Sequence, residues 1–191
     1  MTSREAEEYR ALRATIRERG SLRVVLFVVA VIAWAAATIA TAALAALPVA
    51  TLLPLLVLAA GFESVFAVHT GVERVGRYLQ VFYDDDGTRE WERITMAYGR
   101  AFPGGGPDAL FSAYFYLATL LNFVPVLLAE PVRLEVAVVG TVHLLFVGRV
   151  LLAHRASGRQ RALDLERFER LKAGRREGEA GEAPISVRAQ S

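Results

Sequence analysis

Residues 24–62 contain no ionisable side chain, and this run constrains the fold more than any other feature of the chain. As one straight helix, its 39 residues would be about 58 Å long, close to twice the roughly 30 Å thickness of a bilayer's hydrocarbon core. The run must therefore reverse direction, and Pro48 marks the most suitable place for a turn. We expect two membrane spans here, residues 24–47 and 52–71.

The second half of the chain repeats this pattern. Residues 109–128 and 134–153 are apolar segments of membrane length separated by the short loop AEPVR. The sequence therefore predicts an all-α polytopic membrane protein with four transmembrane helices in two hairpins. The first span carries small residues four positions apart, which predict a face that packs closely against another helix; they are Ala33, Ala37, Thr41 and Ala45.

The segments outside the spans are rich in arginine and glutamate. Residues 1–23 predict a short amphipathic helix, with Tyr9, Leu12 and Ile16 on one face and an end near Gly20. No helix breaker follows span two before Tyr83, so its helix is expected to continue into the loop of residues 72–108. That loop is expected to hold a further short helix, Thr88–Tyr98. Residues 154–173 predict another helix, and residues 174–191 a disordered tail.

The positions of the basic residues predict the orientation. All but two of the 22 Lys and Arg residues lie before span one, between spans two and three, or after span four. By the positive-inside rule, both termini and the middle loop are expected in the cytoplasm, with the protein in the inner membrane. The net charge of only +2 gives no reason to expect nucleic-acid binding, and the absence of cysteine excludes disulfides and thiolate chemistry.

Several polar side chains are expected at the middle of the bilayer. Counting from the outer end of each span places Glu63 about 17 Å deep, His143 about 14 Å and Asn122 about 9 Å. A carboxylate at that depth needs a partner or a proton, and His143 is the best candidate partner. A Glu63–His143 pair flanked by Tyr116, Thr119 and Asn122 would form a proton-holding site. The alternative is a structural role in which Glu63 is protonated and hydrogen-bonded to Asn122 or to a backbone carbonyl.

A second polar group is expected at the inner membrane surface. His69 and Glu73 are four residues apart, a spacing at which both side chains can bind one metal ion. No third ligand is evident, so we predict no metal site. Glu73 is instead expected to pair with Arg77, and Arg74 and Arg77 to contact headgroup phosphates.

No motif in the chain specifies a catalytic activity. The triplet Asp84–Asp86 lacks the alternation of a calcium loop, and the glycines that follow Pro103 lack the Lys-Ser or Lys-Thr of a phosphate loop. We therefore expect no enzyme activity and no cofactor. The leading hypothesis is a structural or accessory membrane subunit that acts with a partner or as a homo-oligomer. One alternative is a small proton-linked transporter or channel built on Glu63 and His143. The other is an enzyme that acts on lipid headgroups at the inner surface with His69, Glu73, Arg74, Arg77 and the aspartate triplet.

Overall fold

The described part of the chain is almost entirely helical and contains no strand. The structure is a computed structural model that describes residues 2–42, 47–83, 94, 98, 101, 107–128 and 131–181. It contains α1 (Ser3–Ala42), a short 3₁₀ helix η1 (Pro48–Thr51), α2 (Leu52–Tyr83), α4 (Pro107–Leu128) and α5 (Arg133–Gly181). Several expected features lie outside the described residues: most of the segment Thr88–Tyr98, the triplet Asp84–Asp86, the glycines after Pro103, and residues 182–191.

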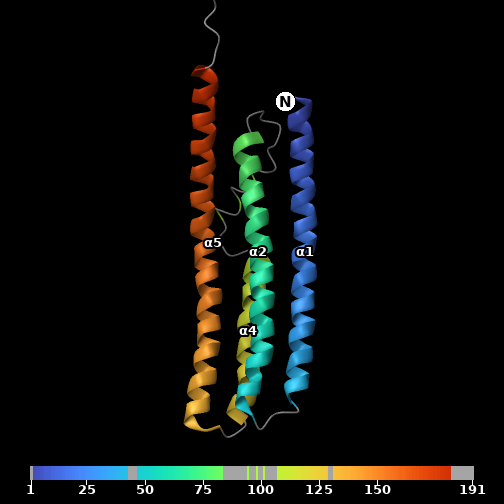
Figure 1. Cartoon of the computed structure of the whole chain (residues 1–191), viewed down its shortest axis with the longest axis vertical. Helices are drawn as coiled ribbons and strands as arrows, with labels where there is room; N and C mark the ends of the chain where they lie inside the picture. The colour runs from blue at the N-terminus through green and yellow to red at the C-terminus, as the bar shows by residue number, and fades with distance from the viewer. Residues whose placement is uncertain are drawn as a thin grey trace, which may run out of the picture.

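The four long helices lie side by side along one axis (Figure 1). The end of α1 and the start of α2 lie at the same end of the bundle as the end of α4 and the start of α5. Helix α1 packs mainly against α2, and α5 packs against both α2 and α4. Because α1, α2 and α5 are longer than α4, they extend together beyond it at the other end of the bundle.

Two of the predicted helix ends are wrong. Helix α1 runs through Gly20 without a break, and α5 continues from the fourth apolar segment through Gly174 to Gly181. A glycine inside a helix costs only about 1 kcal/mol relative to alanine, so good helix formers on both sides can carry the helix through it. The expected separate helices, residues 1–23 and 154–173, are therefore continuations of the apolar helices. Helix α2 continues through residues 72–83 and ends at Tyr83, as predicted.

The core lies among α2, α4 and α5 in the apolar part of the bundle. Phe62 is central to it, with its ring 5.2 Å from that of Phe115 on α4 and 6.0 Å from that of Phe146 on α5, both in edge-to-face geometry. Helix α1 adds Phe27 and Trp34, which pack against this cluster. The remaining core residues are aliphatic: Leu55, Leu58, Ala118, Val150 and Ala153.

Small residues set the contact between α1 and α2. A Cβ atom placed on Gly61 would lie 2.4 Å from the Cβ of Ala30, so this pair permits close approach of the two helices. Of the predicted small face of α1, Thr41 is buried and Ala37 half-buried, whereas Ala33 is exposed and Ala45 lies outside the described residues. The close contact is therefore centred on Ala30 rather than on the predicted row.

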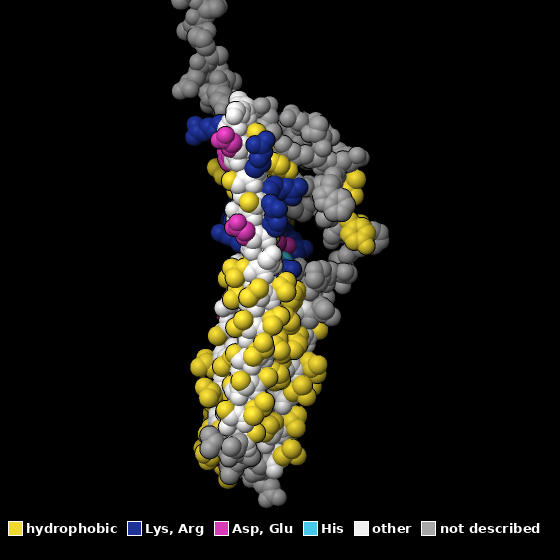
Figure 2. Space-filling view, turned by 90° about the vertical axis from the view of Figure 1, so that its right-hand side faces the viewer, with side chains coloured by type: hydrophobic (Ala, Val, Ile, Leu, Met, Phe, Trp, Pro, Cys, Tyr) yellow, Lys and Arg dark blue, Asp and Glu magenta, His cyan; other side chains and the backbone are white. Residues whose placement is uncertain are grey.

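The outer surface divides into two parts. Apolar side chains cover one end of the bundle, and Lys, Arg, Asp and Glu side chains gather at the other (Figure 2). Many large apolar side chains are exposed at the apolar end, among them Ile39, Leu128 and Leu144. Four helices, Ser3–Ala42, Pro48–Tyr83, Phe111–Leu128 and Arg133–Glu177, are long and apolar enough to cross a membrane. A continuous apolar surface of this kind suggests a membrane protein.

Candidate functional site

Four of the polar residues predicted within the spans lie close together, at the contact of α4 and α5. Asn122 and His143 are both almost fully buried, and the side-chain amide of Asn122 lies 3.0 Å from Nε2 of His143. Thr119 is buried one turn away and donates its hydroxyl to the carbonyl of Phe115 at 2.6 Å. Tyr116 and Thr119 line a groove beside His143.

The hydrogen bonds determine which nitrogen of His143 carries a proton. Nδ1 lies 2.8 Å from the carbonyl oxygen of Val139, which can only accept, so Nδ1 carries the hydrogen. Nε2 then accepts from the Asn122 amide, which also donates to the carbonyl oxygen of Thr51 at 2.9 Å. The neutral imidazole has both ring nitrogens satisfied, and these bonds join α4, α5 and η1.

A groove between α4 and α5 opens beside this group. Its volume is about 510 Å³, and apolar side chains such as Leu120, Phe123 and Leu144 form most of its wall. Tyr116, Thr119 and His143 supply its polar lining. Because both nitrogens of His143 are already bonded, the groove presents mainly an apolar surface.

Glu63 does not join this group, so the expected Glu63–His143 pair does not form. The carboxylate of Glu63 instead accepts a hydrogen bond of 2.8 Å from the guanidinium of Arg149 on α5. The alternative of a hydrogen bond from Glu63 to Asn122 is also wrong, since the Asn122 amide bonds to His143 and Thr51. The guanidinium of Arg149 lies over the rings of Phe62 and Phe66, at 5.8 and 5.6 Å from their centres. Both charged side chains are nearly half exposed, at 48% for Glu63 and 43% for Arg149.

A larger charge network lies where the apolar surface ends. Its centre is an ion pair between Arg77 of α2 and Asp164 of α5, at 3.2 Å, and both side chains are buried. Glu73 lies 3.5 Å from Arg77, as predicted, and also pairs with Arg161 of α5. The pairing with Asp164 makes the prediction that Arg77 contacts lipid headgroups wrong. Arg74 is largely exposed and lies 3.6 Å from Asp164.

His69 extends this network to α1. Its Nδ1 lies 2.8 Å from a guanidinium nitrogen of Arg23, and its Nε2 lies 3.8 Å from the carboxylate of Glu73. Since guanidinium only donates, Nδ1 of His69 is the acceptor and Nε2–H faces Glu73. Among the residues that the structure describes, no three His, Cys, Asp or Glu side chains are placed to hold a metal ion together.

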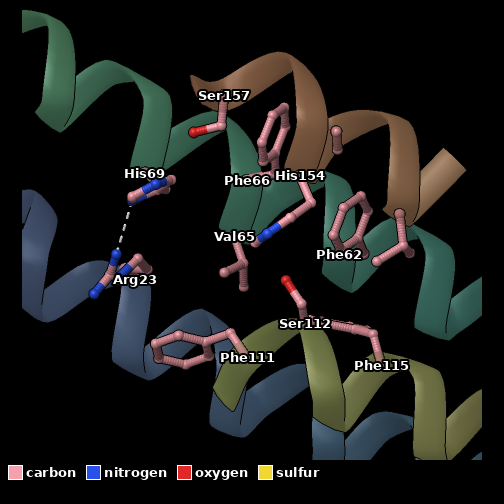
Figure 3. Close-up of a pocket in the computed structure, with 12 residues that line it drawn as sticks. Arg23, Phe62, Val65, Phe66, His69, Phe111, Ser112, Phe115, His154 and Ser157 are labelled. Carbon is pink, nitrogen blue, oxygen red and sulfur yellow. Dashed lines mark hydrogen bonds between the residues drawn. The ribbon is translucent and has the colours of Figure 1, made fainter. Parts of the chain in front are cut away.

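A small cavity lies beside His69, at the meeting point of all four helices (Figure 3). Its volume is about 60 Å³, enough for several water molecules. The polar lining consists of Arg23 from α1, His69 from α2, Ser112 from α4, and His154 and Ser157 from α5. Four phenylalanines form most of the remaining wall: Phe62, Phe66, Phe111 and Phe115.

Near the charged ends of α1 and α2, Glu8 joins the two helices. Tyr78 donates its hydroxyl to the Glu8 carboxylate at 3.0 Å, and the ring of Tyr83 lies 5.7 Å from that of Tyr9. Burial, followed by the hydrogen bond to Glu8 and its negative charge, raises the pKa of Tyr83 to about 12. The pKa of Tyr78 is raised by the same causes.

Several residues of these sites were missed by reasoning from the sequence. Arg149 carried a signal, because it is a basic residue inside an otherwise apolar segment. Asp164 and Arg23 carried none, since charged residues in charged segments are ordinary and only the packing of α1 and α5 on α2 brings them to His69 and Arg77.

The chain was also compared with known proteins. No protein-family model, curated protein or solved structure matches the chain significantly.

Proposed function

We propose that this chain is a multi-pass protein of the inner membrane, with both termini in the cytoplasm, and that it serves as a structural or accessory subunit by associating with copies of itself. The four apolar helices support the membrane placement, and so does the sequence position of the basic residues, all but two of which lie outside the apolar segments and the short loop between the third and fourth. The association is proposed to use the face formed by α2 and α5.

The ion pair of Glu63 and Arg149 is the observation that carries this proposal. The pair is nearly half exposed on an apolar surface, and Glu63 would lie about 17 Å from the outer end of its span. Charged groups facing hydrocarbon cost several kcal/mol, so charged residues in membrane helices face protein or water. A second protein surface that covers the pair would remove this cost.

The charges on this face are complementary to those on the same face of a second copy of the chain. The face presents one acid and one base side by side, so a two-fold axis through it would place Glu63 of each copy near Arg149 of the other. The surrounding exposed side chains are small or aliphatic, which permits close packing in lipid; they include Leu53, Leu56 and Ala60 on α2, and Leu145 and Leu152 on α5.

The charged ends of the helices support an accessory role. Helices α1, α2 and α5 leave the apolar part without a break, and Arg77 and Asp164 hold α2 and α5 together beyond it. Such a bundle would hold the cytoplasmic ends of its helices in a fixed position relative to the membrane.

The transporter hypothesis loses its main support, because Glu63 and His143 have separate partners. The headgroup-enzyme hypothesis is also weakened: of its residues that the structure describes, His69, Glu73, Arg74 and Arg77, His69 alone lines the cavity beside α1.

Cysteine crosslinking in native membranes tests the proposal, because the natural chain contains no cysteine. Ala60→Cys places a thiol on the proposed face, and Ile39→Cys places one at an exposed position of α1 as the matched control. We expect a disulfide-linked dimer with Ala60→Cys and much less with Ile39→Cys. Adding Glu63→Gln to Ala60→Cys should reduce the dimer. Equal crosslinking of both variants, or a crosslink only to a different protein, would overturn self-association through this face.

A further inference from the structure

The groove between α4 and α5 has the shape and lining of a site for an acyl chain. Its walls extend over residues 116–123 of α4 and 140–147 of α5, about 10 Å along each helix. The wall residues Leu120 and Leu144 are largely exposed, so the groove is open on its outer side. Both stretches belong to helices apolar enough to cross a membrane. In the proposed membrane placement, the groove therefore faces hydrocarbon.

Two arginines follow the inner end of this groove on α5. Arg155 lies on the same helix face as Leu144 and Leu151, because spacings of eleven and four residues are close to whole turns. Arg159 follows about one turn later. Arg155 is the second residue after the predicted end of the fourth span at residue 153. Both arginines are therefore placed where hydrocarbon meets the lipid headgroups.

Tyr116 connects the arginines to the groove. Helices α4 and α5 run in opposite directions (Figure 1), and a side chain leans toward the N-terminus of its own helix. Tyr116 therefore leans toward the inner surface, and Arg155 leans back toward the groove. The two residues are close enough for the charge of Arg155 to act on the Tyr116 hydroxyl. This hydroxyl forms no hydrogen bond within the part of the chain that the structure describes, so it can bond to a ligand.

The two arginines have no acidic partner among the described residues. Both are exposed, and the side chain of neither forms an ion pair or a hydrogen bond there. Between Glu135 and Asp164, α5 carries no acidic residue, and Asp164 is paired with Arg77. The described side chains of α4, residues 111–128, include no charged group. An anion at this position would therefore meet two cations without competition from a described carboxylate of either helix.

We propose that this side of the bundle binds an anionic phospholipid, with an acyl chain in the α4/α5 groove and the phosphate held by Arg155, Arg159 and the Tyr116 hydroxyl. Guanidinium groups bind phosphate through charge-assisted hydrogen bonds, about twice as strong as neutral ones. The inference rests on the membrane placement proposed above but not on self-association, because the α5 residues that line the groove differ from those of the face around Arg149. Its failure would leave the Ala60→Cys experiment unaffected.

Thermal unfolding of the full chain in an uncharged detergent tests the site with two lipids that share the same acyl chains. Dioleoyl phosphatidylglycerol is anionic, whereas dioleoyl phosphatidylcholine carries a positive group beside its phosphate. We expect saturable stabilisation by phosphatidylglycerol at concentrations about tenfold lower than those at which phosphatidylcholine acts. Equal effects of the two lipids would overturn the proposal, because the groove would then select an acyl chain without regard to charge.

Variants of the two arginines connect binding to this site. The double variant Arg155→Gln with Arg159→Gln should weaken the apparent affinity for phosphatidylglycerol by about tenfold or more, the usual effect of losing charged hydrogen bonds. Arg10→Gln with Arg17→Gln, an equal charge change at exposed positions of α1, should leave the affinity unchanged. Because Arg155 and Arg159 are exposed, their replacement should not disturb folding. Equal affinities of the two double variants would overturn the proposal.

A variant of the groove tests the position of the acyl chain. Gly140→Leu adds a side chain to the groove wall, where a Cβ atom would be in ordinary contact with the ring of Phe123, at 3.7 Å. We expect a severalfold loss of affinity for phosphatidylglycerol. An unchanged affinity would place the acyl chain elsewhere and overturn the proposal. A disulfide-linked dimer of Leu144→Cys in native membranes would also overturn it, since a second copy of the chain would then occupy the groove.

Discussion

At the scale of single residues, the polar groups inside the apolar part serve packing. Asn122, His143 and the carbonyl of Thr51 satisfy one another across three elements, while Val139 accepts the remaining imidazole proton. A buried polar network of this kind is stable only when each member is bonded, because an unpaired buried donor or acceptor costs about 1–3 kcal/mol. We therefore assign His143 a structural role.

Replacing Asn122 by leucine should show this role directly. The variant leaves Nε2 of His143 and the carbonyl of Thr51 without their donor, so we expect a loss of about 2 kcal/mol in the free energy of unfolding. Unfolding in mixed micelles with increasing denaturing detergent measures this loss. Asn122→Leu combined with His143→Leu should recover part of it, because both partners are then apolar. Additive losses in the double variant would contradict the assignment.

Tyr83 gives a second residue-level prediction, in the charged part of the bundle. Its pKa of about 12 in the folded protein exceeds the ordinary 10.0, so the folded state holds the phenolic proton more tightly than the unfolded state. The stabilisation from the protonated phenol is fully present below pH 10.0 and is lost as the pH rises through about 12. A difference titration of phenolate absorbance between the wild type and Tyr83→Phe isolates this group. A midpoint near 10.0 for Tyr83 would contradict the prediction.

At the scale of elements, the close approach of α1 and α2 depends on Gly61. Gly61→Ala would put a methyl group 2.4 Å from the Cβ of Ala30, a rigid neighbour that can move only with its helix. We expect a loss of about 1–3 kcal/mol in stability, the usual cost of overpacking. The double variant Gly61→Ala with Ala30→Gly exchanges the small and the larger side chain between the two helices. Its stability should approach that of the wild type. A stability of Gly61→Ala equal to the wild type in detergent unfolding would mean that the helices are not held this close.

The element scale also shows what the sequence could predict. Hydropathy located the four apolar segments, because the length of an uncharged run depends on local composition alone. Helix ends were less predictable: Gly20 and Gly174 looked like stops, yet the flanking residues and the packing of α1 and α5 on α2 carry both helices through. To predict the partners of Glu63 and Arg77, one would need to know how α5 is rotated about its axis. This rotation determines whether Arg149 and Asp164 face α2. No pattern in one chain fixes that rotation.

At the scale of the whole molecule, the apolar and charged parts differ in how α5 is attached. In the apolar part α5 packs against both α2 and α4, and Phe146 and Val150 contribute to the core. In the charged part the contacts of α5 with α2 include the buried ion pair of Arg77 and Asp164 and the packing of Phe168 against Tyr78, with ring centres 5.8 Å apart. The geometry of the charged part therefore depends strongly on Arg77 and Asp164.

Arg77→Leu should release this part while the apolar part stays folded. The substitution removes the main partner of buried Asp164, and breaking a buried ion pair costs about 3–5 kcal/mol. Hydrogen exchange in detergent should show faster exchange over residues 154–177 of α5 and unchanged protection over residues 134–153. Arg170→Leu is the matched control, because it removes an exposed arginine whose partner is Glu166 on the same helix. Uniform loss of protection along α5 would mean that the two parts unfold together, and that Arg77 stabilises the whole bundle rather than its charged end.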